Sequence, residues 1–215
     1  MILNWILLLM TAFIAYTTGS ISTLRVAGRY VFHRDLERLG KGNVWLSNFR
    51  RLFGPLGFIK LALVEIVKDL LPILIGALLI GARGRADIGR LFAAYCLMLG
   101  RLWPVFARFR GCHGSVALIV TAFCIEGSVG AVTLLAVVAA TWLGKTYSLG
   151  AIAGAVAMIA VAVMVVDPRL ILILTALISL LVLIRHIPAI RRMLRKEEEK
   201  ISLEEDISYK FDEKF

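Results

Sequence analysis

The sequence predicts an all-α, polytopic membrane protein with seven transmembrane helices, two of them short, an outside N-terminus and a cytoplasmic C-terminus. Three observations predict this class: the excess of apolar residues, their arrangement in long runs, and the basic residues that separate those runs. Of the 215 residues, 60% are hydrophobic and 19% are charged, whereas soluble domains are about half apolar and about a quarter charged. The net charge of +10 would suggest nucleic-acid binding in a soluble protein. Here the basic residues lie between apolar runs, so we expect contact with membrane lipids and no nucleic-acid partner.

The first apolar run covers residues 2–24 and contains no charged side chain. At 1.5 Å per residue it is about long enough to cross a hydrocarbon core of ~30 Å. It has neither a basic segment before it nor a small-residue cleavage site, so we predict an uncleaved span and no signal peptide. Its first flanking charges are Arg25 and Arg29, and the positive-inside rule makes this end cytoplasmic.

The number of spans depends on the run at 115–143, one of five that follow: 56–81, 86–106, 115–143, 147–166 and 170–187. As one helix this run would be roughly 43 Å long, more than a ~30 Å core needs, and Glu126-Gly127-Ser128 interrupts it near the middle. Two short spans put both basic clusters, at 25–51 and 185–196, on the cytoplasmic side. We therefore predict seven spans.

The chain is predicted to consist of a membrane domain and a short tail. We expect residues 1–187 to form the membrane domain, with cytoplasmic loops at 25–55 and 107–114. Residues 188–215 should form a cytoplasmic tail, in which apolar residues recur near helical spacing between Arg, Lys and Glu. That pattern suits an amphipathic helix on the membrane surface.

The cysteines and histidines form no metal-binding pattern. Cys96, Cys112 and Cys124 are odd in number and include no Cys-x-x-Cys pair, so we expect free thiols. The three histidines are far apart in the sequence and form no His-Glu-x-x-His motif. We predict no metal site and no cofactor.

Three charged residues fall within the second apolar run. Glu65, Lys68 and Asp69 are spaced i, i+3 and i+4, so they share one helix face. Each charge at bilayer depth costs on the order of 2.5–3.5 kcal/mol on insertion scales. We therefore expect these side chains to face a polar interior, with Glu65 paired to Lys68.

Three basic stretches, the first two of which contain glycines, are candidates for the chemistry. In the first, glycines flank Lys41, which lets backbone N–H groups turn toward an anion, although a loop touching lipid headgroups has the same composition. In the second, the turn from Gly111 to Gly114 enters a helix and suits a phosphate, although a simple turn between membrane helices also explains it. The third contains His186 at the end of the last span, where a lone histidine is more often structural than catalytic.

These stretches carry motifs in a consistent order. The pieces are Gly19-Ser20-Ile21, Gly42-Asn43, Ser47-Asn48-x-x-Arg51, Lys68 with Pro72, Leu99-Gly100, Trp103-Pro104-Val105-Phe106, Phe109-Arg110-Gly111 with Gly114, Ser148-Leu149-Gly150-Ala151-Ile152, and Arg185-His186. Together they resemble the bacterial acyl-phosphate:glycerol-3-phosphate acyltransferase (PlsY-like) family over nearly the whole chain. The resemblance implies a multi-pass enzyme of the bacterial inner membrane with its active face in the cytoplasm. It also implies transfer of a fatty acyl group from acyl phosphate to the 1-hydroxyl of glycerol 3-phosphate, which gives lysophosphatidic acid for phospholipid synthesis.

The resemblance also assigns site residues. Ser20, His113 and His186 are the expected catalytic groups. The expected substrate-binding residues are Gly42, Asn43, Ser47, Asn48, Arg51, Lys68, Arg110, Gly111, Gly114, Arg192 and Glu198. Because an acyl phosphate is already activated, positioning and charge neutralisation could suffice without a protein nucleophile.

The sequence also departs from the family's usual motifs. Leu39, Lys41, Trp45 and Leu46 replace small or polar residues of motif one; Arg101 replaces a histidine, His113 a lysine and Ala189 an asparagine. Two alternatives therefore stay open. The chain could be a catalytically silent paralogue that scaffolds or regulates other membrane lipid-synthesis proteins. It could also transfer the acyl group to a different acceptor, with Cys112 carrying that group transiently.

Overall fold

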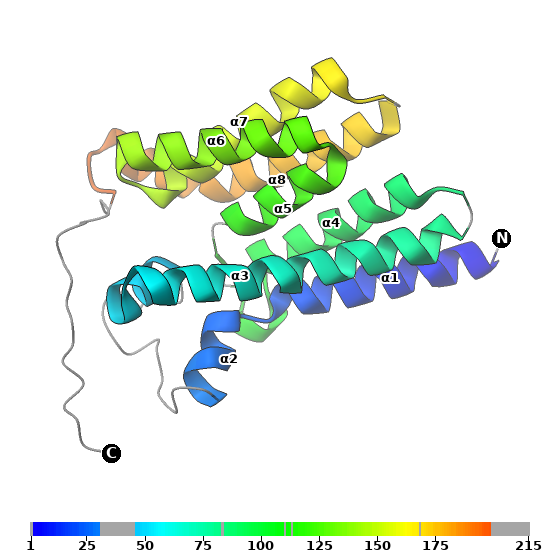
Figure 1. Ribbon diagram of the computed structural model, residues 1–215, viewed down its shortest axis with the longest axis horizontal. Coiled ribbons are helices and arrows are strands. Elements are labelled where there is room, and N and C mark those ends of the chain that lie inside the picture. Colours follow the sequence, from blue (N-terminus) through cyan, green and yellow to red (C-terminus); the bar gives the residue numbers. More distant parts are fainter. Residues whose placement is uncertain are drawn as a thin grey trace. The chain divides into compact units, whose positions relative to one another are not determined.

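The structure, a computed structural model, describes residues 2–30, 46–82, 84–109, 111–112, 114–167 and 169–198 of the chain. Every regular element in these ranges is helical, as the sequence predicts (Figure 1). The elements are α1 (Ile2–Ser20), α2 (Thr23–Tyr30), α3 (Leu46–Gly81), α4 (Ala86–Leu102), the 3-10 helix η1 (Val105–Ala107), α5 (Ser115–Ile125), α6 (Gly127–Gly144), α7 (Tyr147–Val165) and α8 (Arg169–Leu194).

The chain divides into two compact units. One consists of Met1–Ile21 with Ile66–Lys200, and the other of Ser22–Glu65 with Ile201–Phe215. The first unit therefore holds α1, the later part of α3, and α4 to α8. The second holds α2 and the earlier part of α3.

The region predicted as a loop at 25–55 contains helix at both ends. The first span stops at Ser20, and the Ser22 hydroxyl accepts a hydrogen bond from the Arg25 backbone N–H (3.4 Å) at the start of α2. A serine in this position favours a new helix, because it satisfies a free N–H of the first turn. The helix α3 begins at Leu46, well before the apolar run at 56–81, since helix formation does not require an apolar sequence.

The run at 115–143 is broken where the sequence predicts. Glu126 has extended backbone angles (φ −158°, ψ 142°) and separates α5 from α6. With 11 residues, α5 is about 16 Å long and does not cross a full bilayer alone. Arg90 donates to the Cys124 carbonyl oxygen (3.3 Å) at the end of α5, which satisfies a terminal carbonyl and suits the negative end of the helix dipole.

The last helix continues beyond the predicted end of the last span. Helix α8 runs through Pro188 to Leu194 without interruption. Within 188–198, the part of the predicted tail that the structure describes, the helix is a continuation of the last apolar helix.

Among the described residues, five helical stretches are long and apolar enough to cross a membrane. They are α1, Ala86–Ala107, α6, α7 and α8. The helix α3 carries Glu65, Lys68 and Asp69 within its apolar part, and α5 is the short helix just described. The chain is a multi-pass membrane protein.

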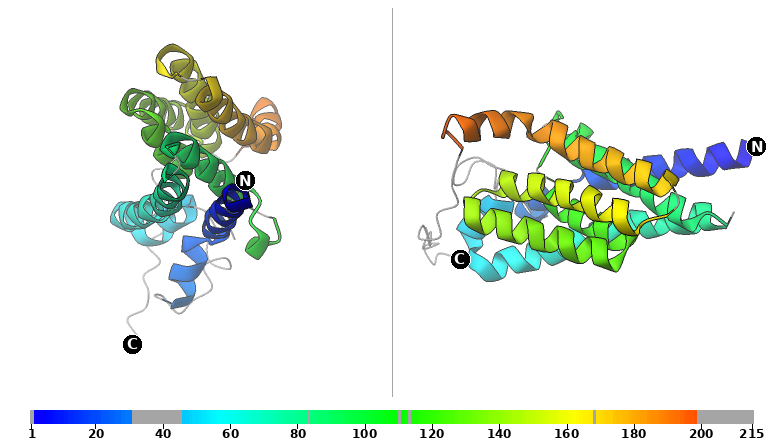
Figure 2. Two further views of the ribbon diagram at one scale, coloured as in Figure 1. Left: turned by 90° about the vertical axis from the view of Figure 1, so that its right-hand side faces the viewer. Right: turned by 90° about the horizontal axis from the view of Figure 1, so that it is seen from above.

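In the first unit α4 packs against α1, α5 and α8. The helix α7 packs against α5, α6 and α8, and α6 also packs against α5 (Figures 1 and 2). Glycines allow the close approach of α1 and α4, because a Cβ on Gly100 would lie 2.2 Å from the Tyr16 carbonyl oxygen. Small residues at such contacts are typical of membrane helices. The Tyr16 hydroxyl also donates to the Trp103 carbonyl oxygen at 2.9 Å.

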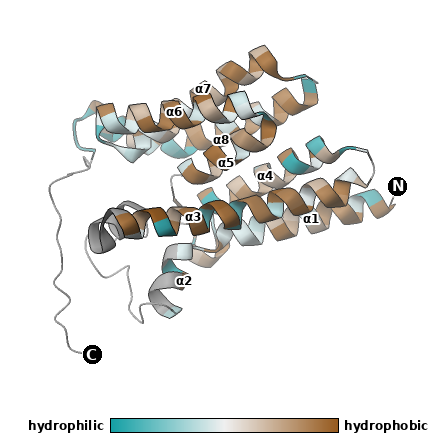
Figure 3. Ribbon diagram, in the orientation of Figure 1, coloured by the Kyte–Doolittle hydropathy of each residue, from teal (hydrophilic) through white to brown (hydrophobic). Residues whose placement is uncertain are grey.

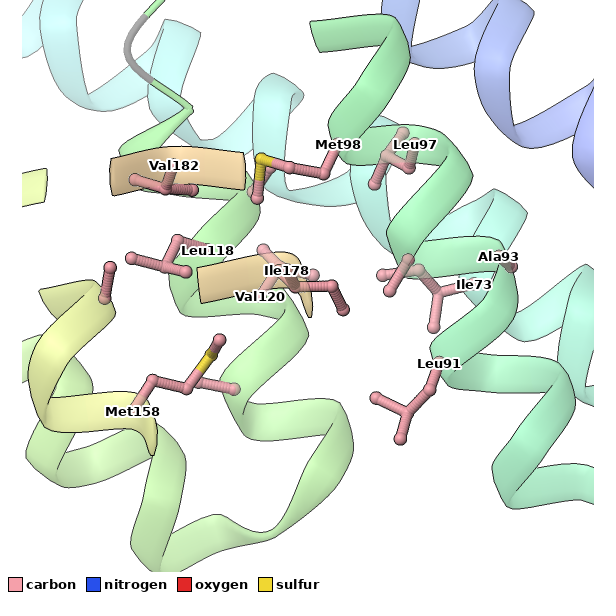
Figure 4. Packing of buried hydrophobic residues seen from close by; sticks show 14 of the residues in the cluster. Ile73, Leu91, Ala93, Leu97, Met98, Leu118, Val120, Met158, Ile178 and Val182 are labelled. Atoms are coloured by element: carbon pink, nitrogen blue, oxygen red, sulfur yellow. The ribbon is translucent and has the colours of Figure 1, made fainter. Parts of the chain in front are cut away.

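The core of the first unit lies around α4. Buried side chains from α3, α4, α5, α7 and α8 meet there, among them Ile73, Leu97, Leu118, Met158 and Ile178 (Figure 4). The outer faces are also apolar: Phe13 is 71% exposed and Trp142 is 73% exposed, and α6 and α7 are coloured mostly as hydrophobic in Figure 3. An apolar exterior of this extent fits contact with lipid.

Candidate functional site

The C-terminal end of α4 joins two of the predicted motif segments. The last carbonyls of a helix have no partner within it and must be satisfied by other groups. The Gly100 carbonyl oxygen accepts a hydrogen bond from the hydroxyl of Ser20 (3.4 Å), which is 2% exposed. The Arg101 carbonyl oxygen accepts one from the Cys112 backbone N–H (3.3 Å). The end of α1 and the segment before α5 are therefore both attached to the end of α4.

Two charged residues of α3 hold the same region. The Lys68 ammonium donates to the Ile21 carbonyl oxygen, just after α1, at 2.7 Å. Asp69 forms a buried ion pair with Arg101, whose Nη2 contacts both carboxylate oxygens. The polar groups that contact Lys68 and Asp69 thus lie at the ends of neighbouring helices; the Glu65–Lys68 pair stays a prediction.

The predicted anion turn lies directly against α4 and leads into α5. A Cβ on Gly111 would lie 2.3 Å from the carbonyl oxygens of both Arg101 and Leu102, so only glycine fits without displacement. Gly114 has φ 71°, a left-handed conformation that favours glycine, and it immediately precedes Ser115, the first residue of α5. The expectation that this turn enters a helix is confirmed.

The end of α8 approaches the same turn. Arg185 Nη2 donates to the Gly111 carbonyl oxygen at 3.2 Å. The next residue, His186, is 2% exposed, and its Nδ1 lies 2.7 Å from the Val182 carbonyl oxygen. With the proton on Nδ1 donated to this carbonyl, Nε2 is the nitrogen that carries the lone pair.

Glu198 connects the beginning of α7 with the end of α8. The Ser148 hydroxyl donates to Glu198 Oε1 at 2.7 Å, and Arg192 Nε donates to Glu198 Oε2 at 2.6 Å. Ser148 is almost completely buried, whereas the Arg192 side chain is half exposed. Both carboxylate oxygens of Glu198 therefore bind protein groups.

The structure describes only part of the predicted site. The predicted residues that lie outside the described ones are Gly42, Asn43, Arg110 and His113. Three more, Ser47, Asn48 and Arg51, belong to the first turns of α3, and their side chains are likewise outside the description. Their roles stay predictions.

Sequence reasoning missed the Asp69–Arg101 pair. The sequence marks the two residues only separately, Asp69 as a charge at bilayer depth and Arg101 as a substitution for histidine. The signal that could have joined them is that they are opposite charges within two apolar helices, where a charge needs a polar partner.

Among the residues that the structure describes, no group of three His, Cys, Asp or Glu residues could hold a metal ion. Cys96, Cys112 and Cys124 are free thiols, with Cys96 buried and the other two partly exposed.

Comparison with known proteins identifies the family. The family model described as Glycerol-3-phosphate acyltransferase matches residues 9–196, which is most of the chain. The chain belongs to the glycerol-3-phosphate acyltransferase family. The resemblance inferred from the motifs is confirmed at this level.

Relatives and solved structures in this acyltransferase family match over nearly their full lengths. The glycerol-3-phosphate acyltransferase of Thermoanaerobacter sp. (strain X514) is 27% identical over 198 residues, 92% of this chain and 98% of the relative. That of Syntrophotalea carbinolica is 31% identical over 192 residues, 86% of this chain and 93% of the relative. Crystal structures of PlsY, an integral membrane glycerol 3-phosphate acyltransferase, share the fold. The glycerol 3-phosphate form has a TM-score of 0.76 at 23% identity and covers 91% of this chain and 96% of that chain. The lysophosphatidic acid form has a TM-score of 0.77, also at 23% identity, and covers 93% and 97%.

Proposed function

We propose that this protein transfers a fatty acyl group from acyl phosphate to the 1-hydroxyl of glycerol 3-phosphate, giving lysophosphatidic acid and inorganic phosphate. The observation that carries the proposal is the family match over residues 9–196. The contacts that join Ser20, Cys112 and Arg185 to one region support it, because they bring segments from three motifs together.

Both substrates carry phosphate, so the site needs two places for an anion. One is the turn Gly111–Gly114 with the start of α5, where backbone N–H groups and the positive end of a helix dipole favour phosphate. Arg110 and His113 would add charge at this turn. The other is the motif-one segment, where Gly42, Asn43, Ser47, Asn48 and Arg51 would bind the second phosphate.

The chemical step needs a group that accepts the proton of the attacking hydroxyl. His186 suits this role, because its Nδ1–H is directed to the Val182 carbonyl oxygen and Nε2 keeps the lone pair. The substrate hydroxyl oxygen forms a bond to the acyl carbon, the bond from that carbon to the phosphate oxygen breaks, and the hydroxyl proton goes to Nε2. The phosphate leaves with the electron pair of the broken bond.

The other predicted residues with described side chains are assigned supporting roles. Ser20 and Lys68 bind main-chain carbonyl oxygens near the ends of α4 and α1, which supports positioning of these segments. Arg192 and Glu198 bind each other, and the contact of Glu198 with Ser148 supports a brace between α7 and α8.

We assign the chain seven spans in the bacterial inner membrane, with the N-terminus outside and the C-terminus and the active face in the cytoplasm. When α3 counts as one crossing, and α5 and α6 as one crossing each, the ends of α1, α4 and α8 lie on one side of the membrane. The starts of α5 and α7 lie on the same side. The basic clusters at 25–51 and 185–196 are then on that side, as the positive-inside rule requires. Residues 1–187 would form the membrane domain, with loops at 25–55 and 107–114, and 188–215 the cytoplasmic tail.

The test uses purified protein in lipid nanodiscs with palmitoyl phosphate and glycerol 3-phosphate, and lysophosphatidate is measured by mass spectrometry. We expect product that depends on both substrates and that His186→Ala decreases by about a hundredfold or more. No product, under conditions in which an authentic family member is active, would contradict the proposal and favour a catalytically silent paralogue. A screen of other acceptors in the same assay identifies an altered substrate.

A further inference from the structure

A buried ion pair joins α3 to α4 at a position where this chain departs from the family's usual motif. Asp69 is 0% exposed and Arg101 is 7% exposed, and the Arg101 guanidinium contacts both oxygens of the Asp69 carboxylate. Arg101 stands where the family usually has a histidine. Its side chain is therefore directed to a carboxylate of the protein.

A buried ion pair contributes little net stability, because both charges lose their hydration. Its best-attested use is to fix one arrangement of the elements that carry it. In this chain the pair links α3 to the last turn of α4. It therefore fixes the orientation of the helix end from which the next segment starts.

That next segment is the predicted anion turn, and it is attached to Arg101 itself. The Cys112 backbone N–H donates to the Arg101 carbonyl oxygen. A Cβ on Gly111 would lie 2.3 Å from the same oxygen, so the two segments are in direct contact. Arg185 also binds this segment, because its Nη2 donates to the Gly111 carbonyl oxygen.

We propose that Asp69 and Arg101 form a positioning pair for the anion turn of the acyltransferase site. The side chain of Arg101 fixes the end of α4, and its carbonyl oxygen fixes the turn that follows. This inference rests on the proposed function for its kinetic consequence, but its structural consequence does not depend on turnover. Both substrates carry phosphate, and the pair controls the binding of the one whose phosphate lies at this turn.

The first experiment measures amide hydrogen exchange of the peptide that contains Cys112, in the full-length protein in nanodiscs. Asp69→Asn and Arg101→His are compared with Asp87→Asn, which removes the exposed partner of Arg90 at the other end of α4. We expect exchange at Cys112 about tenfold faster in the first two variants and unchanged in the control. Equal exchange in all three would overturn the inference, whether or not the protein is an enzyme.

The second experiment separates positioning from general stability. Asp69→Glu and Arg101→Lys keep both charges but change the geometry, so these variants should fold. We expect KM for one of the two substrates to rise about tenfold, KM for the other to change less than about twofold, and the melting temperature to stay near that of wild type. The double variant Asp69→Asn/Arg101→Gln removes both charges, and we expect it to keep the raised KM even where its melting temperature recovers. Equal changes of both KM values, or recovery of KM together with the melting temperature, would overturn the inference.

Discussion

Replacement of Gly111 by alanine tests how closely the anion turn must lie against α4. The new Cβ would lie 2.3 Å from two carbonyl oxygens, whereas such atoms essentially never approach closer than 3.0 Å. The turn or the end of α4 must therefore move by roughly 1 Å. A shift of that size in a positioning element costs about a hundredfold in rate, and the crowding costs about 1–3 kcal/mol in stability.

The assay compares Gly111→Ala with Gly127→Ala, a matched substitution at the start of α6 where a Cβ would meet nothing within 4 Å. The rate of lysophosphatidate formation and the melting temperature are measured for both in nanodiscs. We expect kcat/KM to fall about a hundredfold for Gly111→Ala and to change less than about twofold for Gly127→Ala. If the two variants behave alike, the close contact of the turn with α4 has no part in the activity.

Three further predictions concern other parts of the chain. Glu198→Ala removes the acceptor of the Ser148 hydroxyl and the partner of Arg192, and we expect a loss of about 1–3 kcal/mol in stability; a melting temperature equal to that of wild type would argue against the brace. Cys112→Ser keeps the backbone bond to Arg101, so we expect turnover within about twofold of wild type and no thiol-bound label after incubation with labelled acyl phosphate. A label that Cys112→Ser abolishes would instead support acyl transfer through this thiol. A fluorescent protein fused after Phe215 should be bright and alkaline phosphatase fused there inactive, because the C-terminus is assigned to the cytoplasm; the reverse result would exclude seven spans with this orientation.

The helical class of the fold followed from the sequence because long apolar runs have few alternatives in a membrane. The break at Glu126 was also predictable, since an apolar run of that length must be divided to fit a bilayer. The start of α3 at Leu46 was not, because the run that predicts a span marks only the part of a helix that needs an apolar environment. The same reason explains why α8 extends past residue 187 to Leu194.

The candidate site was predictable as a set of motifs but not as a set of contacts. The order of the glycine and arginine positions indicated the family, yet nothing in the local sequence connects Ser20 to Gly100 or Arg185 to Gly111. These contacts join residues that are many positions apart, so they depend on how α1, α4 and α8 pack. The contact of Asp69 with Arg101 likewise depends on how α3 and α4 pack, whereas helical spacing predicts pairs on one helix, such as Glu65 with Lys68.

The polarity of two helix ends explains how one short segment can be both firmly attached and able to bind an anion. The helix α4 ends in carbonyl oxygens, which accept the Ser20 hydroxyl and the Cys112 N–H. The helix α5 begins directly after Gly114 with N–H groups and a partial positive charge. The carbonyl end of α4 holds the turn through the Cys112 N–H and leaves the N–H groups of the first turn of α5 for a phosphate. The Asp69 carboxylate near that end of α4 is neutralised by Arg101. Attachment and anion binding therefore use opposite ends of consecutive helices, which is why displacement of the turn should weaken substrate binding before it unfolds the protein.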